Sequence, residues 1–425
     1  MKIHPLRTLS TLVLLTLVNS ISAQVNFSAN DFGQIPAYTS YFQYGSNMGY
    51  YGPTWDDKSL ADIAAGNISK NVKGAGAKSL RLFLPEVFLE TWGYDIRIDA
   101  FNHYASLGIS ENVVVLEIPS PAHTDPIHYG GCVDQSKMFN NLYAPIWDGG
   151  ANGTPVNEAN YFALYVYKTV TRYKSQTRFW EIINEPDLDY VGHSSQQPGE
   201  PGNWWDNNPV PCELAALKAP IFHYVRMLRI AYDVIKTIDP TAYVAPGGLG
   251  HPSFLDAILR NTDNPVDGSI TAEYPLNGGA YFDVMSFHSY PGYALKSWDN
   301  AIMGFVYHRH SDAAANEFLN KMNSMKQVLA NRGYNGTTYP SKIFICTESN
   351  IGRLPFLDAG GVPMIGSDLA QKNYMMKAIL QAQKNQVVQF YSFVLGDTKF
   401  DPEAVNELEV MGFYKKLDGV GPIVS

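Results

Sequence analysis

The sequence has few cysteines and lacks the spacings by which cysteine and histidine bind metals. Its 425 residues include three cysteines, too few for a disulfide-stapled scaffold. No CxxC or HExxH pattern occurs, so we expect no metal site. Cys346 lies within an apolar run and is expected to be a buried free thiol. Cys132 and Cys212 lie between the predicted strands and helices, and the sequence leaves open whether they pair.

Charge is also sparse. Charged residues make up 17% of the chain and hydrophobic residues 45%, a balance that suits a large buried core and excludes a disordered chain. The formal net charge of -9 disfavours nucleic acid and anionic membranes as partners. Aromatic residues are plentiful, at 13% with 27 tyrosines. Aromatic faces combined with hydrogen-bonding groups suit neutral sugars.

The longest apolar run lies at the N-terminus. Lys2 and Arg7 precede an apolar stretch over residues 9–18, and small residues lead to Ala23. The stretch is shorter than the roughly 18 residues that span a bilayer, and the pattern is that of an export signal. We therefore expect a signal peptide over 1–23, a secreted or periplasmic protein without a membrane span, and one domain over 24–425.

Short β-rich runs alternate with helical patterns along the chain, which indicates βα units and a parallel sheet. Eight strands are predicted, over residues 39–47, 78–84, 112–118, 178–184, 242–247, 282–290, 342–348 and 387–395. The clearest helical patterns cover 157–174, 219–238, 313–331 and 368–384. This α/β pattern predicts a single (β/α)8 TIM barrel, with a doubly wound sheet as the alternative. Long loops follow the third strand (119–156) and the fourth (186–214), on the face where barrel active sites form.

The strongest chemical signal is the run FWEIINEP over residues 179–186. An apolar strand ends in Asn184 and Glu185, and Pro186 then stops the ladder. A carboxyl at this place is expected to point into the barrel mouth, beside an amide that can bind a sugar hydroxyl. Glu181, inside the same strand, is predicted to be structural.

The Asn-Glu-Pro motif resembles the acid/base motif of glycoside hydrolase clan A. In that clan the nucleophile is a Glu at the end of the seventh strand, which matches Glu348 in IFICTESN (343–350). The resemblance implies a retaining glycosidase, with Glu185 as acid/base and Glu348 as nucleophile. The negative charge of Glu348 is then expected to raise the pKa of Glu185. Two carboxyls and water suffice for this reaction, so no cofactor is expected.

Further positions match the clan's pattern. Arg81 in SLRLF resembles its second-strand arginine, which steadies the nucleophile. His288 or Tyr290, in FHSYP at the end of the sixth strand, is expected to hydrogen-bond Glu348. The chain departs from many clan members at the end of strand eight, where no tryptophan forms a platform for the sugar. Tyr391 or Phe393 is the candidate substitute, and a residue of another loop is the alternative.

Substrate contacts are expected from loop aromatics and strand-end amides. The full set of predicted binding residues is Asn184, Arg81, His288, Tyr290, Trp204, Trp205, Trp147 and Asn47. Runs such as YVYK (165–168), WEIINEPD (180–187), GNWWD (202–206) and SFHSYP (286–291) are similar to glycoside hydrolase family 158, whose members cleave β-1,3-glucan internally. Family 39, with β-xylosidase activity, is the nearest alternative. Transglycosylation and a non-catalytic sugar-binding barrel also remain open.

Overall fold

All eight predicted strands occur in the computed structural model, which describes residues 27–52, 54–189, 208–358 and 360–417. The expected signal peptide lies outside the described residues. The strands are β1 (Gln43–Asn47), β2 (Ser79–Phe83), β3 (Asn112–Leu116), β4 (Thr177–Ile182), β5 (Tyr243–Pro246), β6 (Val284–Ser289), β9 (Ile343–Ser349) and β10 (Val387–Ser392). The apolar runs pair as parallel strands because both faces of the sheet are covered.

The eight strands form one curved sheet. Their order is β5-β4-β3-β2-β1-β10-β9-β6, and every neighbouring pair is parallel. The two end strands approach each other: the N–H of Asp283 donates to the carbonyl of Val244 at 2.8 Å, and Leu249 bridges Phe287. The sheet is therefore a nearly closed barrel, and the (β/α)8 prediction is confirmed.

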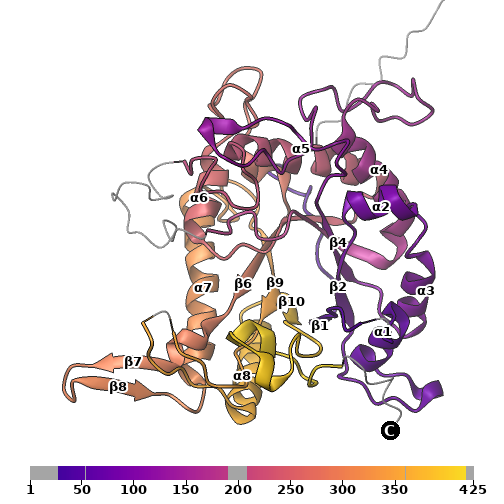
Figure 1. Cartoon of the computed structure of the whole chain (residues 1–425). Helices are drawn as coiled ribbons and strands as arrows, with labels where there is room; N and C mark the ends of the chain where they lie inside the picture. The colour runs from indigo at the N-terminus through magenta and orange to yellow at the C-terminus, as the bar shows by residue number, and fades with distance from the viewer. Residues whose placement is uncertain (1–26, 53, 190–207, 359, 418–425) are drawn as a thin grey trace, which may run out of the picture.

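Helices ring the barrel in chain order (Figure 1). The four predicted helices appear within a few residues of their expected bounds, as α4 (Tyr161–Tyr173), α5 (Ile221–Ile238), α7 (Asp312–Asn331) and α8 (Asp368–Lys384). The sequence reading did not assign α1 (Asp57–Ala65), α2 (Glu86–Trp92), α3 (Ile98–Ser106) and α6 (Pro252–Arg260), all nine residues or shorter. Within the described part of the chain, β10 is followed only by the 3-10 turns η7 (Asp401–Glu403) and η8 (Glu407–Val410). No described helix is long and apolar enough to cross a membrane.

The barrel interior is layered. Its apolar layer is one buried cluster drawn from six strands, made of Val113, Phe179, Tyr243, Ala245, Val284, Ile345 and Tyr391. Gly45 makes room for this layer, because a Cβ there would lie 2.4 Å from the Tyr391 ring. Interior positions nearer the carboxyl ends of the strands are polar, and they carry Arg81, Glu181, Ser286 and Thr347. This polar layer supports the mouth of the barrel.

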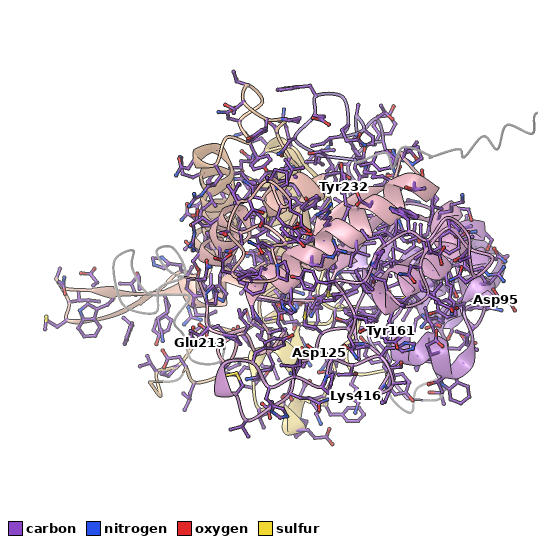
Figure 2. All side chains as sticks on the ribbon, turned by 90° about the horizontal axis from the view of Figure 1, so that it is seen from above. Asp95, Asp125, Tyr161, Glu213, Tyr232 and Lys416 are labelled. Carbon is purple, nitrogen blue, oxygen red and sulfur yellow. A yellow bond between two sulfur atoms is a disulfide. The ribbon has the colours of Figure 1, made fainter. Side chains whose placement is uncertain are left out.

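The two long loops are joined by a disulfide between Cys132 and Cys212, whose Cα atoms lie 5.3 Å apart. Cys346 is buried and free, as predicted. In Figure 2, Asp125 and Glu213 from these loops lie on the same side of the molecule as Lys416, which follows β10. A hairpin of β7 (Lys296–Asp299) and β8 (Gly304–Tyr307) projects from the barrel (Figure 1). The loops that follow the strands thus gather over one face.

Candidate active site

Glu185 lies just beyond β4 on an unusual backbone. Ile183 has a φ of 59° and Glu185 a φ of 45°, values uncommon for side chains other than glycine. The N–H of Glu185 donates to the carbonyl of Gly247 at 2.6 Å, which fixes the turn against β5. A Cβ on Gly247 would lie 1.3 Å from the carbonyl oxygen of Ile183, so glycine is required there. Such strain clusters at functional sites, where it aims a side chain.

Glu348 lies inside β9, one residue before the strand ends. The pairing of β6 with β9 is irregular here: Phe287 faces Cys346, but His288 faces Glu348, so Thr347 is bulged. Bulges re-aim side chains near active sites. One Glu348 oxygen accepts a hydrogen bond from Arg81 and the other accepts one from the Tyr290 hydroxyl. The Glu348 side chain is only 8% exposed, so these two donors compensate most of its lost hydration.

Arg81 connects four strands beneath the mouth. Its Nε donates to Glu181 at 2.7 Å, its Nη2 donates to Asn184 at 2.7 Å, and Nη1 donates to both Glu348 and Asn47. Burial lowers the pKa of Arg81, but the charges of Glu181 and Glu348 outweigh it and the pKa is raised. Glu181 also accepts hydrogen bonds from Ser286 and Thr347, so it has the structural role that we predicted.

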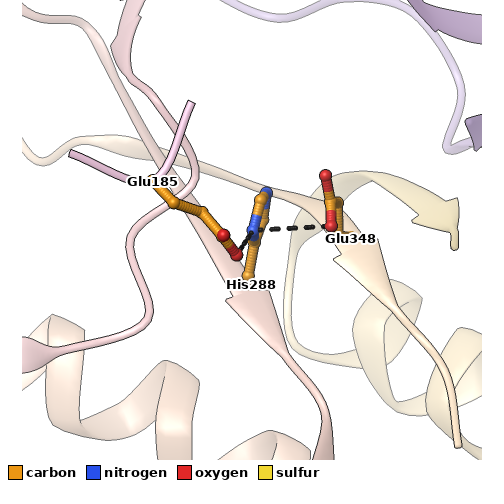
Figure 3. Close-up of side chains that lie close together, drawn as sticks. All are labelled: Glu185, His288 and Glu348. Carbon is orange, nitrogen blue, oxygen red and sulfur yellow. Dashed lines mark hydrogen bonds and ion pairs between the residues drawn. The ribbon is translucent and has the colours of Figure 1, made fainter. Parts of the chain in front are cut away.

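His288 lies between the two mouth carboxyls (Figure 3). Its Nδ1 is 2.7 Å from a Glu185 oxygen and 3.7 Å from a Glu348 oxygen. Its Nε2 is 3.1 Å from the Thr347 hydroxyl, which orients the ring. A Cβ on Gly248 would lie 2.1 Å from Nε2, so the glycine allows the ring to sit there. Of the two residues expected to hydrogen-bond Glu348, Tyr290 does so, whereas His288 hydrogen-bonds Glu185.

The position of His288 reverses one expectation. Burial raises the pKa of Glu185, but the hydrogen bond and charge of His288 outweigh it, so the pKa is lowered. Burial lowers the pKa of His288, and the charges of Glu348 and Glu185 outweigh it in turn, so that pKa is raised. We predicted a raised pKa for Glu185 from the charge of Glu348. That prediction is wrong for this arrangement, because the hydrogen bond and charge of His288 determine the direction of the shift.

The spacing of the carboxyls restricts the chemistry open to the site. One oxygen of Glu185 and one of Glu348 lie within 4.8 Å of each other, with a His288 nitrogen inside the same limit. Carboxyl groups about 5–5.5 Å apart allow attack by one and proton transfer by the other, whereas water insertion needs about 6.5–9.5 Å. The same three side chains are the described group that could hold a cation. However, Arg81 and Tyr290 already occupy both Glu348 oxygens.

A cavity of about 550 Å³ opens over Glu348 and Glu185. Phe393 lines it and meets the Tyr290 ring edge-on at 5.7 Å, while Tyr391 is fully buried in the apolar layer below. Of the two candidates for the missing tryptophan, only Phe393 reaches the cavity. Asn47 lines it too, but its amide donates to the carbonyls of Thr347 and Ser392 and accepts from Arg81. The contacts of Asn47 therefore position Arg81.

A second cavity, of about 780 Å³, lies beside the first, between the loops that follow β3 and β4. Asn184 lines both cavities. Trp147 is not among the described residues that line either one: it packs half-buried against the hydrophobic core and pairs with Val156. Trp204 and Trp205 lie outside the described residues. Of the predicted tryptophan contacts, the described structure brings none to the site.

The sequence analysis missed Glu117, the first residue after β3. It lines the larger cavity, and one of its oxygens accepts the backbone N–H of Asn184 at 3.1 Å. The sequence did contain a signal for it, because Glu117 lies near the end of the apolar run VVVLEI (113–118), much as Glu185 and Glu348 lie at the ends of theirs.

Comparison with known proteins gives no family. No family model matches the sequence, and no curated protein matches it. Three solved structures illustrate the likeness in fold. Virulence factor SghA from Agrobacterium tumefaciens is 12% identical over 89% of this chain and 92% of its own, with a TM-score of 0.48. A glucosidase from Croceicoccus marinus is 11% identical over 92% and 66%, also with a TM-score of 0.48.

The third is a β-glucosidase from Thermotoga maritima in complex with castanospermine. It is 14% identical, over 89% of this chain and 93% of its own, with a TM-score of 0.47. Because these identities and scores are low, the functional argument rests on the residues of this chain.

Proposed function

We propose that this chain is a secreted, retaining endo-β-glycoside hydrolase that cleaves a neutral β-1,3-glucan of the laminarin type. One observation carries the reaction class: two strand-end carboxyls have oxygens within 4.8 Å of each other and are held by opposite partners. Glu348 accepts hydrogen bonds from the Arg81 guanidinium and the Tyr290 hydroxyl, which fix the position of its two oxygens. Glu185 is bound to His288, which can exchange a proton with it.

In the proposed first step, a Glu348 oxygen attacks the anomeric carbon while the bond from that carbon to the leaving oxygen breaks. Glu185 gives its proton to the leaving oxygen, which departs as a hydroxyl group. In the second step, water attacks the same carbon, Glu185 takes the proton of the water, and Glu348 is released. The configuration at the anomeric carbon is retained because it is inverted twice.

His288 supplies the protonation state that the first step needs. The raised pKa of His288 and the lowered pKa of Glu185 favour the imidazole as the proton holder of this pair. Transfer across the 2.7 Å contact from Nδ1 gives a protonated Glu185 beside an ionised Glu348. The free energy of this transfer depends on the water that substrate displaces from the mouth, because Glu185 is 29% exposed without it.

Endo action is supported by the two cavities that Asn184 joins. The one of about 550 Å³ is lined by both catalytic carboxyls, and the one of about 780 Å³ continues from it between the loops that follow β3 and β4. Sugars of one chain could occupy both sides of the scissile bond. The β-1,3 linkage rests on the sequence resemblance to family 158, and export rests on the N-terminal signal pattern.

The first test is a product profile on laminarin, run beside xylan and mixed-linkage β-glucan, with Glu348→Gln as the matched control. We expect short laminari-oligosaccharides from the wild type and none from the variant. Cleavage of xylan alone would keep the mechanism and reject the β-1,3-glucan assignment. Sugar binding without cleavage of any β-glycan would indicate a non-catalytic barrel.

A further inference from the structure

A third carboxyl, that of Glu117, lies at the barrel mouth and has no part in the two-step reaction. Its main chain is held on both sides: its N–H donates to the Tyr165 hydroxyl at 3.3 Å, and its carbonyl accepts the N–H of Glu86 at 3.0 Å. Its Oε2 accepts the N–H of Asn184 at 3.1 Å. The carboxyl is therefore fixed in place, half-buried, and at the wall of the larger cavity.

The bond to Asn184 ties Glu117 to the acid/base turn. Asn184 lies between Ile183 and Glu185, the two residues of that turn with positive φ. An acceptor for the intervening N–H helps to hold a conformation that the backbone alone disfavours. This contact needs a carbonyl-type oxygen but not a negative charge, so a glutamine could provide it.

The charges around the larger cavity are mostly negative. Among its described lining residues, Glu117 and Asp134 are acidic and Lys137 is basic, and the Asp134 carboxylate lies 3.8 Å from the Lys218 ammonium. The Lys137 ammonium donates to the carbonyl of Ala215 at 2.7 Å, so a protein group already binds it. Burial raises the pKa of Glu117. The Asn184 N–H and the charge of Arg81 lower it by less, and the charges of Glu181 and Glu348 act in the same direction as burial. A sugar carboxylate placed beside an ionised Glu117 would meet a group of like charge, which is unfavourable.

We propose that Glu117 is a specificity-determining subsite residue. One of its oxygens holds Asn184, and the other accepts hydrogen bonds from the hydroxyls of a neutral sugar in the larger cavity. By the same charge, Glu117 rejects a sugar that carries a carboxylate there. Selectivity of this kind arises from a repulsive group as much as from an attractive one. The inference rests on the proposed function and assigns the substrate class of the second cavity.

The experiment compares kcat/KM on laminarin with kcat/KM on laminarin whose primary hydroxyls have been partly oxidised to carboxylates. Glu117→Gln keeps an acceptor for the Asn184 N–H and removes the charge. We expect the preference for neutral laminarin to fall by about 10-fold in this variant, the size of effect that one contact in a pocket produces. Glu117→Ala should also lower kcat on both substrates, because it removes the acceptor. Glu213→Gln removes one carboxylate from the same face without lining the cavity, and it should leave the preference unchanged.

An unchanged preference in Glu117→Gln, with neutral laminarin still cleaved, would overturn the inference and leave the proposed function standing. An equal loss of preference in Glu213→Gln would overturn it as well, because the effect would then come from the charge of the whole face. A wild type that cleaves neither substrate would overturn the proposed function, and the inference with it.

Discussion

The carboxyl at the end of β9 and the carboxyl beyond β4 are held in opposite ways. Glu348 belongs to a strand, is 8% exposed and binds a guanidinium and a phenol. Glu185 lies on a backbone with positive φ, is 29% exposed and binds an imidazole. A buried carboxylate held by a guanidinium and a phenol suits a nucleophile, and a partly exposed one beside a titratable group suits proton transfer. This difference is the ground on which we propose Glu348 as the nucleophile and Glu185 as the acid/base.

The largest effect on kcat is expected from replacing Glu348, the carboxyl of β9. Glu348→Ala removes the group that forms the covalent intermediate, and we expect kcat to fall on the order of 10⁴-fold or more. With azide added and an activated aryl β-glycoside as substrate, azide can attack directly from the vacated face. The product should be the α-glycosyl azide, identified by NMR. A β-glycosyl azide would mean that the two roles are exchanged.

Replacing Glu185, the carboxyl beyond β4, should affect different substrates to different extents. Glu185→Ala removes the general acid, and we expect a loss of about 10²–10⁴-fold on laminarin, whose leaving group needs a proton. A dinitrophenyl β-glycoside needs no proton to leave, so its glycosylation step should change little. Azide should rescue this variant as the β-glycosyl azide. Equal losses on both substrates would contradict an acid/base role for Glu185.

Because His288 contacts Glu185 and titrates with it, the two carboxyls should also differ in their effect on the pH dependence of kcat/KM. The raised pKa of His288 means that the Glu185–His288 pair keeps its proton at low pH and loses it as pH rises through a value above the ordinary 6.5. The kcat/KM of the wild type should therefore fall on that alkaline side. In His288→Asn only the carboxyl can hold the proton, so the alkaline limb should move to lower pH. If the alkaline limb of the pH profile lies at the same pH in His288→Asn as in the wild type, His288 does not share the proton of Glu185.

The smallest effect on chemistry is expected from the disulfide. Cys132 and Cys212 are 80 residues apart in sequence, and closing a loop of that length stabilises the fold by about 4 kcal/mol in the chain-entropy model. Cys132→Ser should lower Tm by several degrees, measured by calorimetry. Because neither catalytic carboxyl contacts the bridge, kcat on an aryl glycoside should change less than about twofold. A large loss of kcat in a Cys132→Ser variant that is fully folded would show that the two loops contribute to catalysis.

Much of this site could be predicted from the sequence, because the end of a strand is recognised from the residues next to it. Apolar runs ending in Glu185 and Glu348 place both residues at the carboxyl ends of parallel strands, where barrel sites form. The same rule, applied to the third strand, would have found Glu117. The helices that were missed, such as α1 and α6, are short, and a short apolar pattern does not distinguish helix from strand.

The sequence by itself determined the eight-stranded barrel, the positions of Glu185 and Glu348 at its mouth, the buried thiol of Cys346 and the contact residue Arg81. Only the tertiary structure decided which carboxyl His288 binds, that Phe393 reaches the cavity while Tyr391 does not, and that Cys132 pairs with Cys212. The physical reason is the distance in sequence between the residues that interact. Strand ends can be predicted from neighbouring residues, whereas a hydrogen bond between two strands depends on their register. The bulged residue in β9 shifts the register between β6 and β9 next to His288.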